Sequence, residues 1–243
     1  MEALLYAALG TLIAMIGSMS GIGGGVFMVP LFYYMGYPIN QAVGTSLFII
    51  IFNSVSATIS YWRRGRLRPG SWIVMAILMV PSSVLGAQAV AFFPRRLLVI
   101  IVAAVLLMFS LNILLRPDGQ ERGKGRRNPL LIPIAGLTAG FIAGLAGVGG
   151  GAVLMPVLVS VLNIPVHEAV AASMMSIVLS SFFGSAVHAY NGNIVYSLAI
   201  PFALGAVVGG QLGSYVASKT SPRALRKVVG VVLIFVALSM IFR

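Results

Sequence analysis

Long apolar stretches dominate the chain, and short breaks rich in charged residues, glycine or proline separate them. Because a helix needs about 20 apolar residues to cross the hydrocarbon core of a bilayer, the pattern predicts an all-α integral membrane protein. The expected helical segments are residues 3–20, 25–37, 40–62, 71–93, 96–115, 130–147, 151–163, 167–190, 194–217 and 222–242. Segments 25–37 and 151–163 are only about 20 Å long at 1.5 Å per residue. The pattern leaves open whether they are re-entrant or complete crossings.

The two halves of the chain resemble each other, which predicts an internal duplication. Segment 21–25 reads Gly-Ile-Gly-Gly-Gly, and segment 147–151 reads Gly-Val-Gly-Gly-Gly 126 residues later. Further matches pair Ala42, Val43 and Ser46 with Ala169, Val170 and Ser173, and the run 86–88 with the run 209–211. The expected organisation is a first membrane repeat at 1–117, a basic cytoplasmic linker at 118–129 and a second membrane repeat at 130–243.

Charge decides the expected orientation of these repeats. Only 8% of the 243 residues are charged, against about 25% in a soluble domain, and the net charge of +12 reflects cationic loops rather than nucleic-acid binding. With five segments per repeat in opposite orientations, thirteen of the sixteen Lys and Arg lie in cytoplasmic loops; with parallel repeats only ten do. Cytoplasmic loops carry the excess of cations, so two five-segment inverted repeats are predicted, with both termini outside.

The glycine clusters are the first candidate site. Glycine costs about 1 kcal/mol relative to alanine inside a helix, and backbone groups freed by a break must be buried in protein or line a wet cavity. A helix follows each cluster, so its N–H groups and dipole favour an anion in the break. Close helix packing through small residues is the alternative. The expected anion-binding glycines are Gly21, Gly23, Gly24 and Gly25 with Gly147, Gly149, Gly150 and Gly151.

Neutral polar residues inside the spans form the second candidate set. Hydroxyls and amides donate hydrogen bonds to an anion without the cost of a buried charge, although each of them alone also serves to hold helices together. The residues expected to complete the anion site are Thr45, Ser46, Asn53, Gln88, Ser173, Ser180 and Gln211.

Ionisable groups are scarce in the predicted spans. No Asp, Glu, Lys or Arg lies at the centre of a span, which argues against a cation pump. A proton-coupling role is open for His167, Glu168 and His188, although Glu168 also fits a first-turn residue that complements a helix dipole. There is no cysteine, which excludes thiolate sites, and no metal or other cofactor is expected. An enzyme is disfavoured because the two histidines lie near span ends.

The sequence resembles the TauE/SafE sulfite exporter family. The resemblance rests on the paired Gly-x-Gly-Gly-Gly-x-x-x-x-Pro stretches, on Ala-Val-Gly-Thr-Ser at 42–46 with Ala-Val-Ala-Ala-Ser at 169–173, and on the basic loop between the halves. It implies a multi-pass permease of a prokaryotic plasma (inner) membrane that moves sulfite, a sulfonate or a related small organic anion. The second copy departs from the first at Gly44 and Thr45, which become Ala171 and Ala172.

The residues predict a secondary anion transporter that works by alternating access between the repeats, with export favoured. The resemblance implies that its substrate is a small sulfur-containing oxyanion. A passive anion channel is the alternative. The expected partners are the anionic substrate and the lipid bilayer, with no nucleic acid, and a homodimer is left open. The individual anion, the coupling ion and the direction of transport do not follow from the residues.

Overall fold

The structure is a computed structural model, which describes residues 2–67, 70, 72–115, 131–162, 164–219, 234 and 238. Within these residues the regular elements are all helical. In chain order they are α1 (Glu2–Ser20), α2 (Gly25–Tyr34), α3 (Ile39–Arg63), α4 (Trp72–Ala89), α5 (Arg95–Leu115), α6 (Leu131–Ala146), α7 (Gly151–Pro156), a π-helical turn η1 (Val157–Val161), α8 (Val166–Tyr190) and α9 (Tyr196–Ala217).

The membrane character predicted from the sequence is confirmed. Five helices, α1, α3, α4, α8 and α9, are long and apolar enough to cross a bilayer, and large side chains such as Leu85, Phe92 and Leu204 are exposed on the outer surface. The helix bounds lie within a few residues of the expected segments, except that 151–163 is divided between α7 and η1. The tenth expected segment, 222–242, lies almost entirely outside the described residues.

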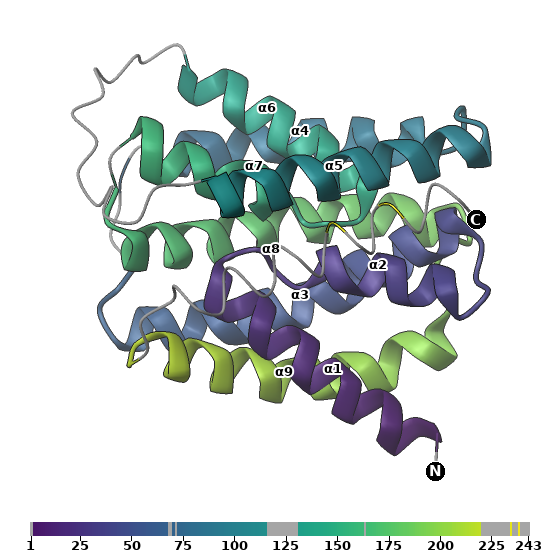
Figure 1. Cartoon of the computed structure of the whole chain (residues 1–243), viewed down its shortest axis with the longest axis horizontal. Helices are drawn as coiled ribbons and strands as arrows, with labels where there is room; N and C mark the ends of the chain where they lie inside the picture. Colours follow the sequence, from purple (N-terminus) through teal and green to yellow (C-terminus); the bar gives the residue numbers. More distant parts are fainter. Residues whose placement is uncertain are drawn as a thin grey trace.

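The helices form two bundles that do not coincide with the halves of the sequence (Figure 1). Helix α1 packs mainly against α9, and both lie with α3; helix α6 packs mainly against α4, and both lie with α8. Each bundle therefore contains one long helix from the other half of the chain, α9 in one bundle and α4 in the other. We call α1, α2, α3 and α9 the first bundle, and α4, α6, α7 and α8 the second bundle. The contact between α3 and α8 joins them.

Small residues explain why these particular helices pair. A Cβ atom on Gly10 would come within 3.0 Å of the backbone of Phe202 in α9, and one on Gly136 would meet the backbone of Met75 in α4 in the same way. Close backbone approach of this kind is typical of small-residue seams in membrane helices. The glycine seams in the two halves therefore hold α1 to α9 and α6 to α4.

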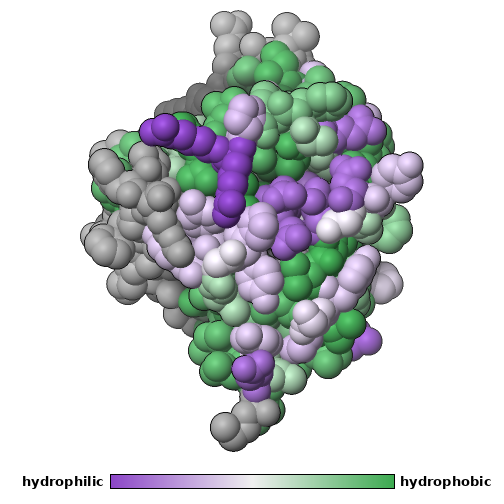
Figure 2. All heavy atoms as spheres, turned by 90° about the vertical axis from the view of Figure 1, so that its right-hand side faces the viewer, coloured by the Kyte–Doolittle hydropathy of each residue, from purple (hydrophilic) through white to green (hydrophobic). Residues whose placement is uncertain are grey.

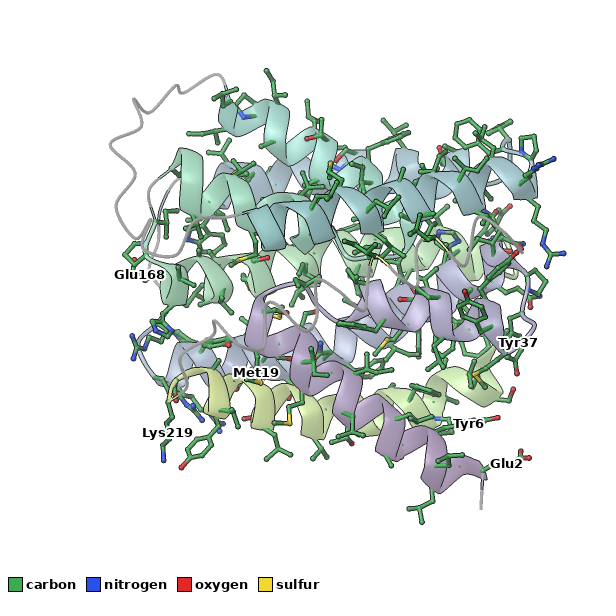
Figure 3. The ribbon with its side chains drawn as sticks, in the orientation of Figure 1. Glu2, Tyr6, Met19, Tyr37, Glu168 and Lys219 are labelled. Carbon is green, nitrogen blue, oxygen red and sulfur yellow. The ribbon has the colours of Figure 1, made fainter. Side chains whose placement is uncertain are left out.

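The short helices return the chain to the end from which it came. Glu2 at the start of α1 and Tyr37 just after α2 both lie at one end of the molecule, and Met19, near the end of α1, lies between the ends (Figure 3). Glu168, in the first turn of α8, and Lys219 lie at the opposite end, where α6 also begins (Figures 1 and 3). We call these the Glu2 end and the Lys219 end. The α1–α2 pair enters from the first, and the α6–α7 pair enters from the second.

Candidate functional site

The two glycine clusters lie buried where the chain turns from α1 to α2 and from α6 to α7, and they have matching backbone conformations. Gly21, Gly23 and Gly24 have φ values of 75°, 89° and 85°, and the glycines 126 positions later, Gly147, Gly149 and Gly150, have values of 71°, 76° and 80°. Side chains rarely adopt this left-handed region, whereas glycine does so at little cost. In both clusters the last of these residues is the N-cap of the next helix.

The clusters contact each other across the boundary between the bundles. A Cβ atom on Gly25 would meet the carbonyl oxygen of Gly147, and one on Gly151 would meet the carbonyl oxygen of Gly21. Neither Gly25 nor Gly151 has a positive φ, so glycine is required there by the lack of space. The clusters thus form one closed, reciprocal contact.

Two serines join the bundles at this contact. The Ser46 hydroxyl in α3 donates to the Gly147 carbonyl at 2.8 Å, and the Ser173 hydroxyl in α8 donates to the Gly21 carbonyl at 2.6 Å. Each serine belongs to one half of the chain and holds the cluster of the other half. Both hydroxyls are fully buried, and both bonds cross the boundary between the bundles.

One further side chain holds each cluster from within its own bundle. Asn53 Nδ2 donates to the Gly23 carbonyl at 2.9 Å, and its Oδ1 accepts from Ser18 at 2.6 Å. Ser180 lies at the equivalent place and donates to the Gly149 carbonyl at 3.2 Å. The sequence predicts that these donors bind an anion directly; in this conformation they bind carbonyl groups and fix the glycine turns.

The other three predicted polar residues lie away from the clusters. Thr45 Oγ1 accepts the backbone N–H of Val195, so it holds the loop between α8 and α9. Gln211 is exposed and donates from Nε2 to the Ser56 carbonyl at 2.9 Å. Gln88 is exposed on α4. The structure therefore does not bring Thr45, Gln88 and Gln211 to the glycine clusters.

The packing also corrects the register in which Gln88 and Gln211 are paired. Gly86 of α4 lies against the Phe141 carbonyl, and Gly213 of α9 lies against the Met15 carbonyl. Since Met15 and Phe141 are 126 residues apart, the equivalent of Gly86 is Gly213, not Gly209. The sequence match of run 86–88 with run 209–211 is thus one helical turn out of register, because the Gly–small–Gln pattern recurs by chance in a glycine-rich helix.

The residues considered for proton coupling do not form one cluster. His167 and Glu168 lie in the first turn of α8, whereas His188 lies in its last turn, about 30 Å away at 1.5 Å per residue. His188 is fully buried, and its Nε2 is 3.0 Å from the Gly144 carbonyl. Because a carbonyl only accepts, this geometry places a hydrogen on Nε2.

Sequence reasoning missed two buried isoleucines beside the clusters. Ile50 of α3 and Ile177 of α8 both lie against Gly23 and Gly149, with methyl groups 3.0 to 3.4 Å from the Cβ positions of these glycines. Ser181 Oγ lies 3.5 Å from the Cβ position of Gly149. The signal for the isoleucines was available, since 127 residues separate them, as they separate Ser46 from Ser173. Isoleucine in a membrane helix nevertheless looks like ordinary packing.

The comparison with known proteins decides the family. The profile described as "Sulfite exporter TauE/SafE" matches residues 6–240, nearly the whole chain. The chain belongs to the TauE/SafE family. It is 27% identical to Probable membrane transporter protein YunE of Bacillus subtilis over 230 residues, which cover 82% of this chain and 84% of the relative.

Two other relatives of the chain extend the comparison to other kingdoms. A probable membrane transporter protein of Methanocaldococcus jannaschii is 31% identical over 195 residues, which cover 74% of this chain and 70% of the relative. The Arabidopsis thaliana protein named "Sulfite exporter TauE/SafE family protein 3" is 27% identical over 110 residues, or 45% of this chain and 22% of the relative. Together with the apolar helices, these matches identify the chain as a multi-pass membrane transporter. The family is one of membrane transporters and not of enzymes.

Proposed function

We propose that this TauE/SafE transporter moves a small sulfur-containing oxyanion, such as sulfite or a sulfonate, by alternating access. The observation that carries the proposal is the reciprocal contact between the two glycine clusters, at the boundary between the bundles. Broken helices that meet at the interface of two related units are the usual place for a transporter's substrate. The name of the family supports the choice of a sulfo group.

The two bundles are the units that we propose to move. Within a bundle, long glycine seams and the bonds from Asn53 and Ser180 hold each cluster firmly. Between the bundles, the α3–α8 contact, the contact of the two clusters and the bonds from Ser46 and Ser173 join the same region. Movement at this boundary would separate the clusters and withdraw Ile50 and Ile177, exposing the backbone N–H groups at the start of α2 and α7.

Inverted repeats fit the same observations. The two re-entrant pairs enter from opposite ends, and the reciprocal bonds pair each half with the other. Among the described cations, Arg64 contacts Ser214 and Ser218 at the Lys219 end, whereas Arg95 and Arg96 begin α5 at the other end. We therefore place the Lys219 end in the cytoplasm. Labelling of a cysteine at Arg66 by an impermeant reagent outside intact cells would contradict this orientation.

The transported charge itself supplies the driving force in this proposal. The spans carry no carboxylate at their centres, and an inside-negative potential favours anion export by about 2.3 kcal/mol per charge per 100 mV. His188 is the one of the three coupling candidates that lies beside the second cluster, through Gly144. His167 and Glu168 lie at the Lys219 end, where they could act only on entry or exit.

A flux assay tests the proposal. The purified protein in liposomes should exchange sulfite or sulfoacetate by counterflow, with little flux of chloride, and should not require Na⁺. A passive anion channel, the alternative, would show unitary currents and no counterflow. Wild-type flux that requires Na⁺ would contradict the uncoupled mechanism.

A further inference from the structure

A cavity of about 460 Å³ lies at the Glu2 end, away from the glycine clusters. Its polar lining residues are Asn40, Arg95, Asn191 and Asn193, and its apolar ones include Ala91 and Phe93. We call it the Arg95 vestibule. In the view onto this end, hydrophilic side chains gather near the middle of the face, with apolar surface around them (Figure 2). A cavity lined by amides in an otherwise apolar protein indicates a binding site for a polar ligand.

Arg95 supplies the charge of the vestibule. It is the only charged residue among those that line the cavity, all of which lie in the described part of the chain. The cavity is built from the starts of α3 and α5, the segment after α4 and the loop after α8. Helix ends of both polarities meet there, so their dipoles oppose one another. A cavity lined by one guanidinium group and three amides favours a small oxyanion, because the guanidinium group donates in a planar fork.

Two of the amides, Asn40 and Asn193, are oriented by hydrogen bonds that lead inward. Asn40 Nδ2 donates to Asn193 Oδ1 at 2.8 Å, and Asn193 Nδ2 lies 3.5 Å from Nδ1 of buried His188. His188 in turn reaches the Gly144 carbonyl, three residues before the second glycine cluster. Each amide nitrogen also carries a second hydrogen that these two bonds do not use.

The departure from repeat symmetry at Gly44 and Thr45 serves this arrangement. A Cβ atom on Gly44 would meet the Asn193 carbonyl and lie 3.0 Å from the His188 Cβ atom, and Thr45 accepts the N–H of Val195. These two residues let the loop that carries Asn193 dock on α3. The second copy has alanine at both positions, 171 and 172.

We propose that the Arg95 vestibule is an oxyanion-binding site at the Glu2 end of the transport route. Arg95 attracts the anion, and Asn40, Asn191 and Asn193 donate hydrogen bonds to it. The identity of this anion with the transported substrate rests on the proposed function, whereas binding in the vestibule does not.

Site-directed labelling in the full chain tests the proposal, because the protein has no native cysteine. We would introduce Ala91→Cys, which lines the cavity and is exposed, and measure its reaction with the anionic reagent sulfonatoethyl methanethiosulfonate and a cationic trimethylammonioethyl analogue. We expect the anionic-to-cationic rate ratio to fall roughly ten-fold with Arg95→Gln. Arg96→Gln, the neighbouring arginine outside the lining, should change it less than about two-fold. In the Ala91→Cys protein that retains Arg95, sulfoacetate should slow the labelling reaction, and this protection should saturate with sulfoacetate concentration.

The outcomes separate this site from simpler explanations. Equal effects of Arg95→Gln and Arg96→Gln, or no protection by sulfoacetate, would overturn the proposal. Protection seen in phospholipid-free detergent but lost in nanodiscs would assign Arg95 to a lipid phosphate and overturn it too. Acetate and sulfate, tested alongside, report which oxyanion binds best. Protection by sulfoacetate without sulfoacetate flux in liposomes would contradict the proposed function but support the binding site in the vestibule. Flux without protection would support the proposed function but contradict the binding site in the vestibule.

Discussion

The two glycine clusters have the same backbone conformation but different surroundings. The first is followed by a regular ten-residue helix, α2, and is fixed by Asn53, which bonds both Gly23 and Ser18. The second is followed by the six-residue α7 and the π-turn η1, and the side chain that holds it from its own bundle is Ser180, through a longer bond to Gly149. Short π segments often occur at functional sites.

Hydrogen bonding is a second difference between the two clusters. Ser54, which follows Asn53 in α3, bonds its own helix at the Ile50 carbonyl at 2.7 Å. Its counterpart Ser181 is fully buried, and its hydroxyl has no hydrogen-bond partner among the described residues. A buried unsatisfied hydroxyl costs about 1–3 kcal/mol. In the proposed mechanism, the first cluster would therefore be the fixed member of the pair, and the second would be the member that changes partners.

The largest expected effect comes from forcing the clusters apart. Gly25→Ala and Gly151→Ala each place a methyl group against a carbonyl of the other cluster, without the strain of a positive φ. We expect either change to reduce liposome flux at least ten-fold, because the closed contact cannot form. Gly184→Ala is the matched control, since its methyl group would lie 3.5 Å from Leu47, an ordinary contact.

Chromatography in detergent must show that these variants remain folded and monodisperse. Wild-type flux in both Gly25→Ala and Gly151→Ala would mean that the contact between the clusters does not form during transport. Loss of flux in Gly184→Ala as well would show only a general intolerance of bulk in these helices.

A smaller effect is expected on stability when the side chain that holds each cluster, Asn53 or Ser180, is removed. Asn53→Ala removes the side-chain donor to the Gly23 carbonyl, while the Ser18 hydroxyl keeps its bond to the Ala14 carbonyl. The buried Gly23 carbonyl left without this donor should lower stability by about 1–3 kcal/mol. Ser180→Ala removes one long bond and should cost about 0.6 kcal/mol, the average for hydrogen bonds between membrane helices. Thermal unfolding in detergent measures both. Equal losses would remove the argument that the first cluster is the more rigid.

The sequence predicted the helices and the position of the glycine clusters well, because apolar length and left-handed glycine signals are local. Pairings between distant helices were harder to predict. The exchange of α4 and α9 between the bundles depends on seams such as that of Gly10 with Phe202. The sequence of one helix does not indicate which other helix it packs against. The roles of Ser46 and Ser173 as donors to carbonyls, rather than to an anion, follow from contacts between residues more than 100 positions apart.

The last and smallest effect tests which cluster the anion contacts. Ser181→Ala breaks no hydrogen bond, so a purely structural role predicts unchanged or slightly increased stability and unchanged affinity. If the anion satisfies this hydroxyl when the clusters separate, Ser181→Ala should weaken binding of sulfoacetate a few-fold, roughly the value of one neutral hydrogen bond. Ser54→Ala is the matched control in the first half, where the hydroxyl bonds Ile50. Titration calorimetry on both variants compares them. A larger loss of affinity in Ser54→Ala than in Ser181→Ala would reverse the assignment and make the first cluster the one that binds.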